Sequence, residues 1–401
     1  MRFTLVLLAL ISAAAQTAEP LRRNVGRYEV SVRLPAEGLV AGEENQVEFL
    51  VLDTRTIDPA TNAPPPVVRA RIRGVVDMPE MPGMAKFDEI AHSEGIPGVY
   101  GVHPTFPHGG AYRLRISLLP REEQTLGISP PDPEPFSVEF PLTVADTRGA
   151  RRSAAVVPFS LEVVSSPKAP REGEPIELAL RILLENTVDR RPATAFDLAH
   201  EKLMHLFLVR SDLGAFAHEH PSLGDDGVFN LRHTFPSAGR WMVFADVAPK
   251  GAGSQILRGR VVVRGVPFEA FDLAREEASG RALADATDGV VAELRLPPDR
   301  LPTRRTVTLT ASLKDAAGRS VDDLETYLGA MGHLMAIHED GQTFVHSHPD
   351  EREPGTGRDG RIPFLARFPK PGLYRAWLQF QRSGRVHTAR FVLHATDPGE
   401  P

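Results

Sequence analysis

Two short segments of the chain repeat one pattern of histidines: a single His, twelve other residues, and then His-x-His-Pro. The histidines of the two copies are His205, His218, His220, His333, His346 and His348. Imidazole nitrogen is a good ligand for Cu(II), Zn(II) and Ni(II). The repeated spacing therefore predicts that these six residues bind a transition metal, either in one shared site or in two separate sites.

Each copy also has the pattern of a β-hairpin, with a four-residue loop that contains Asp and Gly. If Arg210 pairs with Ala215 across the first loop, His205 lies directly opposite His220, with Cβ atoms about 4.5–5.5 Å apart. His218 shares the face of His220 because strand side chains alternate. Three imidazoles then converge at the end of each hairpin. Ligand imidazoles must be neutral, so metal affinity should fall below about pH 6.5.

Methionines offer a second type of ligand. Of the seven methionines after the initiator, three lie beside the histidines and three in one proline-rich stretch, MPEMPGM. These six are Met204, Met331, Met335, Met78, Met81 and Met84. Thioether sulfur favours Cu(I), so the sequence predicts copper, as Cu(I) or Cu(II), with zinc as the alternative. The proline-rich stretch has a second interpretation, an apolar turn that covers one end of a domain.

Composition limits the chemistry further. The absence of cysteine excludes thiolate zinc sites, iron–sulfur clusters and blue-copper centres. The formal net charge is only −6 and no basic stripe with interleaved aromatics occurs, so we expect no nucleic-acid partner. The sequence has no Gly-x-Ser-x-Gly, His-Glu-x-x-His or phosphate-loop pattern, which favours a metal-binding protein over an enzyme.

The sequence is also compatible with two other functions. One is a copper-dependent oxidase or monooxygenase, in which two domains with different ligand sets form a two-centre enzyme. The other is a structural or adhesive array without metal, in which the histidines are a packing feature of the hairpin that was copied by duplication.

The N-terminus has the pattern of a secretory signal peptide over residues 1–18. Arg2 supplies the positive charge, Phe3–Ile11 the short apolar run, and Ala13–Ala18 the small residues for cleavage. No later segment is long and apolar enough to span a membrane. We therefore expect an exported protein, periplasmic or extracellular, without a transmembrane segment after cleavage.

Alternating apolar runs separated by Pro, Gly and Asp predict an all-β protein of three tandem immunoglobulin-like β-sandwich domains. The expected domains are residues 19–150, which hold the Met-rich stretch, 151–267 and 289–396, with a linker at 268–288 and a tail at 397–401. Within the linker, Phe268–Ala286 could form a short helix.

The segments HEKLMHLFLVRSDLGAFAHEHP and YLGAMGHLMAIHEDGQTFVHSHP resemble the YtkA-like and FixH-like domains of exported bacterial proteins. MPEMPGM and FPHGGAYRLRI in the first domain resemble the same family, which is associated with copper and heavy-metal handling. The resemblance covers most of the second and third domains and about half of the first. It implies immunoglobulin-like sandwiches, the six histidines as ligands, and metal binding or delivery, with another exported copper-handling protein or a membrane protein as partner. The first domain lacks His-x-His-Pro, so a site there would be Met-based.

Overall fold

The computed structural model describes residues 21–397 with short gaps. The gaps are at residues 36–37, 43, 60, 69, 82–85, 95, 120–134, 147–158, 185–189, 251, 253–254, 267–268, 279–282, 298–299, 348 and 350–355. The expected signal peptide, Met84 and His348 lie outside the described residues.

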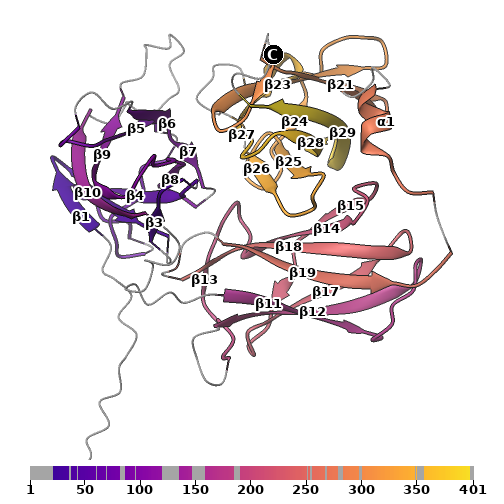
Figure 1. The fold of residues 1–401 in the computed structure, drawn as a ribbon. Coiled ribbons are helices and arrows are strands. Elements are labelled where there is room, and N and C mark those ends of the chain that lie inside the picture. Colours follow the sequence, from indigo (N-terminus) through magenta and orange to yellow (C-terminus); the bar gives the residue numbers. More distant parts are fainter. Residues whose placement is uncertain are drawn as a thin grey trace, which may run out of the picture.

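The regular secondary structure of the described chain is almost entirely β-strand and forms three β-sandwiches in sequence (Figure 1). Each sandwich packs two sheets around its own apolar core. This confirms the predicted architecture of tandem immunoglobulin-like sandwiches. Among the described residues, no helix is both long and apolar enough to cross a membrane.

The first sandwich contains two five-stranded sheets. One has, in spatial order, β1 (Leu21–Val25), β2 (Tyr28–Arg33), β4 (Val47–Asp53), β8 (Val99–Val102) and β7 (His92–Ser93). The other has β3 (Leu39–Val40), β10 (Ser137–Ala145), β9 (Gly110–Leu118), β5 (Ile72–Asp77) and β6 (Phe87–Ile90). The strict alternation of buried and exposed residues along β10 shows a sheet with one face in the core and one face outside.

The second sandwich pairs a four-stranded sheet with a five-stranded sheet. The first sheet has β11 (Phe159–Ser166), β12 (Pro175–Leu184), β17 (Val228–Thr234) and β16 (Ser222–Leu223). The second has β13 (Phe196–Asp197), β18 (Gly239–Pro249), β14 (Met204–Arg210) and β15 (Phe216–Glu219), with β19 (Gln255–Val263) also paired to β18.

The third sandwich repeats this plan. One sheet has β20 (Ala284–Thr287), β21 (Val290–Arg295), β23 (Thr306–Asp315) and β27 (Arg361–Arg367), preceded by the short 3-10 turn η2 (Arg358–Gly360). The other has β22 (Leu301–Pro302), β29 (Arg385–Thr396), β28 (Gly372–Arg382), β25 (His333–His338) and β26 (Phe344–Ser347), with β24 (Leu324–Glu325) also paired to β28.

The interval expected as a linker has two parts. It contains the predicted helix, α1 (Leu273–Ala278), which is shorter than the pattern Phe268–Ala286 suggested. It then ends in β20, which pairs with β21 and so belongs to the third sandwich. The described helix ends at Ala278, and the chain pairs with β21 from Ala284 onward.

The second and third sandwiches pack against each other, and each buries one of its faces in this contact. In β14, Phe207 and Val209 point outward and form one apolar cluster with Met335 and Ile337 of β25. The intervening residue Leu208 points into the core of the second sandwich. As a result, every residue of β14 and of β25 is buried. In Figure 1 this contact lies where β14 and β15 pass below β25 and β26.

Candidate metal centre

The hairpin β14–β15 has the register expected from the sequence. The backbone N–H of Arg210 donates to the carbonyl of Ala215 over 2.9 Å, and Phe207 lies opposite His218. Because strand side chains alternate, His205 lies on the same outward face as Phe207. The hairpin therefore aims its imidazoles away from its own core and toward the third sandwich.

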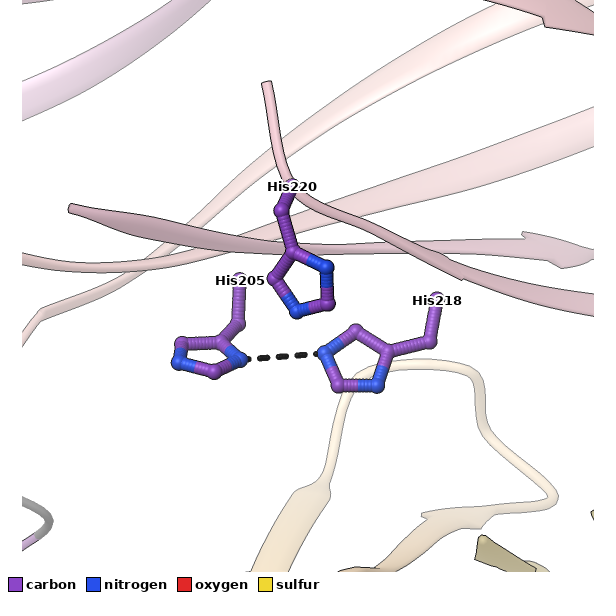
Figure 2. Close-up of side chains that lie close together, drawn as sticks. All are labelled: His205, His218 and His220. Carbon is purple, nitrogen blue, oxygen red and sulfur yellow. Dashed lines mark hydrogen bonds between the residues drawn. The ribbon is translucent and has the colours of Figure 1, made fainter. Parts of the chain in front are cut away.

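His205, His218 and His220 point toward one another at the end of this hairpin (Figure 2). One nitrogen of each lies within 4.8 Å of one nitrogen of the others. The ring centroids of His205 are 5.3 Å from His218 and 5.0 Å from His220. The sequence-based prediction that three imidazoles converge here thus agrees with the geometry.

The second hairpin brings its histidines to the same place. Met335 of β25 lies opposite His346 of β26, as the repeat predicts. His333 and His346 lie 6.4 and 6.1 Å from His205 between ring centroids. His200, which precedes β14, lies 5.6 Å from His333 and 6.0 Å from His205. The described histidines of the two copies therefore form one cluster between the sandwiches together with His200. We call this group the central cluster; its members are His200, His205, His218, His220, His333 and His346.

Two crossed hydrogen bonds give the central cluster a pseudo-twofold arrangement. His218 donates through Nδ1 to Oε1 of Gln379 in the third sandwich, over 2.6 Å. His346 makes the matching contact, from Nδ1 to Oδ2 of Asp246 in the second sandwich, over 3.0 Å. Asp246 lies opposite His205 in the register of β14 and β18, and Gln379 lies opposite His333 in the register of β25 and β28. Each sandwich thus orients a histidine of the other.

The remaining contacts fix which nitrogens carry lone pairs. The Nε2 atoms of His205 and His333 lie 2.9 Å from the carbonyl oxygens of Ala199 and Tyr327, respectively. A carbonyl only accepts, so Nε2 of each ring carries the proton and Nδ1 carries the lone pair. His218 has the opposite tautomer, because its Nδ1 donates to the amide oxygen of Gln379.

The consequence is an electrostatic conflict between two rings. Nδ1 of His205 and Nε2 of His218 lie 3.1 Å apart, and both carry lone pairs in the tautomers just derived. Two acceptors at this distance repel each other unless a proton or a cation lies between them. The buried Nε2 of His220 has no hydrogen-bond partner, so a third nitrogen in the same group lacks a proton donor.

Burial keeps these imidazoles neutral. It lowers the pKa of His205 to about 4, against the opposing effect of Asp246, and lowers the pKa of His220 and His333 to about 3. It also lowers the pKa of His200 to about 2 and that of His218 well below its usual value, with help from neighbouring imidazoles. The expected loss of metal affinity below about pH 6.5 used the value of a free histidine. In the folded protein, protonation of these rings is displaced to lower pH.

The methionines are placed differently from the histidines. Met204 neighbours His205 in sequence but points into the core of the second sandwich, because successive side chains face opposite ways. Met78 lies in the core of the first sandwich and Met81 is 48% exposed. Met331 packs against Gly357. Met335 lies in the apolar layer beside the central cluster, opposite His346.

Sequence reasoning did not single out Asp246 and Gln379. They occupy equivalent positions in the repeat, in WMVFADV and YRAWLQF, and each is a polar residue within an apolar strand. A polar residue at the same position of both apolar strands could have indicated a role for Asp246 and Gln379 in the site. A second signal was the unbroken apolar run in β14, which is unusual for a strand with one face in water.

Comparison with known proteins gives the family. A family described as "Domain of unknown function (DUF8832)" matches residues 160–257 and 285–397, more than half of the chain. The chain belongs to the DUF8832 family. The YtkA-like family matches residues 22–117, which confirms the predicted YtkA-like resemblance. The match falls on the first sandwich, whereas the sequence pattern had placed most of the resemblance in the second and third. The two DUF8832 matches fall on the second and third sandwiches, which carry the histidine motif.

Wider comparisons add little. No curated protein matches the chain. Among solved structures it is similar to invasin, a bacterial integrin-binding protein, at 11% identity and TM-score 0.17 over 92% of this chain and 60% of that one. It is similar to Salmonella alpha-2-macroglobulin at 10% identity and TM-score 0.22, over 94% of this chain and 24% of that one. The chain thus spans less than two thirds of either protein, and values this low say nothing about function.

Proposed function

We propose that this chain is an exported protein that binds copper in the central cluster and buffers it or delivers it to another exported copper-handling or membrane protein. The observation that carries the proposal is the pair of facing lone pairs on His205 and His218, 3.1 Å apart, beside the buried Nε2 of His220. A bound cation removes the repulsion between the two nitrogens and gives His220 a partner.

The residues fit such an ion. Bonds from a transition metal to imidazole nitrogen are about 2.0–2.1 Å long. Two nitrogens 3.1 Å apart then subtend about 100° at the ion, between the angles of tetrahedral and square-planar sites. An all-imidazole ligand set suits Cu(II) first by affinity and Zn(II) second. The carboxylate of Asp246 and the amide of Gln379 orient ligand rings, as such partners commonly do.

The ion is proposed to be shared by the second and third sandwiches. The described histidines of both copies converge on one space, and one histidine of each copy bonds to a polar residue of the other sandwich. His205 is only 1% exposed and His333 is 0% exposed. Burial of this degree favours holding an ion over turnover of a large substrate.

A copper and zinc titration of the full chain, purified without a His tag, tests the proposal. The variants are His218→Ala and His346→Ala, with His394→Ala as the control because His394 lies on the exposed side of β29. A shared site predicts that either of the first two variants weakens the same equivalent, while the control binds as wild type. Loss of a different equivalent in each variant would mean two independent sites.

Two outcomes would replace the proposed function. No bound metal in wild type and no rise in melting temperature with copper would support a structural array instead. Steady oxygen consumption by the copper-loaded protein with a reductant, above that of free copper, would support the oxidase or monooxygenase.

A further inference from the structure

The first sandwich has its own group of ligand-type side chains at one edge of a sheet. His92 lies on β7, opposite Gly101 of β8. His103 follows β8 by one residue and lies diagonally across from His92, so the two rings stack with centroids 4.7 Å apart and planes 12° apart. Glu94 follows β7, and its carboxylate lies 2.8 Å from Nε2 of His92.

The strand opposite is shaped to admit the carboxylate. A Cβ atom at Gly101 would lie 1.8 Å from Oε1 of Glu94 and 3.3 Å from a ring carbon of His92. Any side chain at this position would therefore displace the carboxylate. The backbone conformation of Gly101 does not itself require glycine, because only positions with positive φ do so and Gly101 is not among them. Space for Glu94 is the reason for glycine here.

The group has donor atoms in position for a cation. One ligand atom each from His92, Glu94 and His103 lie within 4.8 Å of one another. Nδ1 of His103 is buried and has no hydrogen-bond partner. Ligand bonds of about 2.0–2.2 Å require these atoms to approach within about 4 Å of one another when an ion binds.

The surroundings are rich in carboxylates. Gln46 donates through Nε2 to Glu94 over 3.3 Å and to Glu48 over 3.0 Å. The backbone N–H of His103 donates to Glu89 over 3.2 Å. Arg367 of the third sandwich lies 3.7 Å from Glu89, and Arg33 lies 3.6 Å from Glu48. The carboxylates around His92 and His103 favour a bound cation, and the two arginines offset part of that charge.

A cavity of about 190 Å³ borders this group. His92, Glu94 and His103 line it from the first sandwich, and Asp246 and His346 line it from the second and third. His346 also belongs to the central cluster, so the same cavity borders both sets of imidazoles.

We propose that His92, Glu94 and His103 form a second metal site, for a divalent transition ion such as Zn(II) or Cu(II), facing the central cluster across this cavity. Its two nitrogens and one carboxylate oxygen make it a mixed site, in contrast to the all-imidazole central cluster. All three ligands of this site belong to the first sandwich, so the site is independent of the central cluster. Only its relation to the central cluster rests on the proposed function.

Metal stoichiometry of the full chain tests the second site. Wild type is titrated with Zn(II) and with Cu(II) beside His103→Ala and Glu94→Gln. The matched control is His108→Ala, since His108 lies in the same sandwich but bonds to the backbone of Gly109. Wild type and the control should bind two equivalents. His103→Ala should lose one, and Glu94→Gln should weaken the same one at least tenfold. Thermal unfolding of the metal-free variants checks that each is folded; Glu94→Gln keeps the side-chain size.

Combining these variants with His218→Ala separates the two proposals. If His218→Ala removes one equivalent and His103→Ala removes another, both sites are present. If wild type binds one equivalent that only His218→Ala removes, the second site is overturned and the proposed function survives. If only His103→Ala and Glu94→Gln remove metal, the second site survives and the central one fails. Unchanged binding in both first-sandwich variants overturns the second site.

Discussion

The hairpins β5–β6 and β14–β15 have the same place in their sandwiches but opposite surroundings. Val75 lies opposite Asp88 in β5–β6, as Phe207 lies opposite His218 in β14–β15. Arg73, two residues before Val75, bonds to Asp88 over 2.6 Å across the same diagonal that joins His205 to His218. The first sandwich therefore has an ion pair where the second has two histidines.

Exposure explains the difference. Arg73 and Asp88 are 47% and 41% exposed, so water solvates both charges. The equivalent face of β14–β15 is covered by the third sandwich, where an unpaired charge is costly. Neutral imidazoles tolerate burial and keep lone pairs for a ligand. Covering one face of a hairpin is thus what separates a solvated ion pair from a candidate metal centre.

The largest expected effect of any single substitution comes from uncovering the hairpin. Phe207→Ala removes a fully buried ring from the layer between the second and third sandwiches, and should cost about 3–5 kcal/mol of unfolding free energy. It should also weaken copper binding, because the crossed bonds depend on this contact. Denaturant unfolding and copper titration measure the two effects. Val75→Ala, the matched change in β5, should cost much less unfolding free energy. Equal losses in the two variants would show that covering the face of β14 does not add to its stability.

The buried hairpin should also make the stability of the metal-free protein sensitive to acid. The folded central cluster resists protonation until about pH 4 for His205 and about pH 3 for His333, whereas unfolded histidines bind protons below 6.5. The unfolded state binds more protons in this window, so metal-free stability should fall as pH drops from 6.5 to 4. The slope is about 1.4 kcal/mol per pH unit for each neutral imidazole. Unfolding free energies measured across this range check it, and a flat profile in wild type would contradict it.

Removing an orienting partner should have an intermediate effect. Gln379→Leu deletes the acceptor that fixes the tautomer of His218, and should weaken metal binding about 10–100-fold. Gln381→Leu is the control, since Gln381 lies on the same strand and bonds to Glu325 instead. Equal affinity of the two variants would mean that the crossed bond does not organise the site.

The smallest effect is expected at the exposed ion pair. Arg73→Ala should change stability by less than about 1 kcal/mol, because solvent screens the pair. It should leave metal stoichiometry unchanged. Thermal unfolding and the same titration measure both. A loss of several kcal/mol would mean that this exposed pair contributes as much to the free energy of unfolding as the buried cluster does.

Local pattern predicted the hairpins well. Strand periodicity, a four-residue loop and the repeated spacing gave the register that opposes Phe207 to His218. These features depend on residues that are close in sequence, so the sequence pattern predicts them. The position of Met204 was harder, because adjacency to His205 hides the alternation that turns it into the core.

By itself, the sequence determined that this is a chain of β-sandwiches with two copies of a three-histidine hairpin, since both follow from periodicity and repetition. Only the tertiary structure decided that the two copies meet. Packing β14 against β25 buries both outward faces and lowers the pKa values of His205 and His333. Each sandwich also supplies a hydrogen-bond acceptor, Asp246 or Gln379, to a histidine of the other. The placement of the first sandwich brings His92 and His103 to a cavity that His346 also lines. Contacts between domains depend on the shapes of whole surfaces, and no local spacing encodes them.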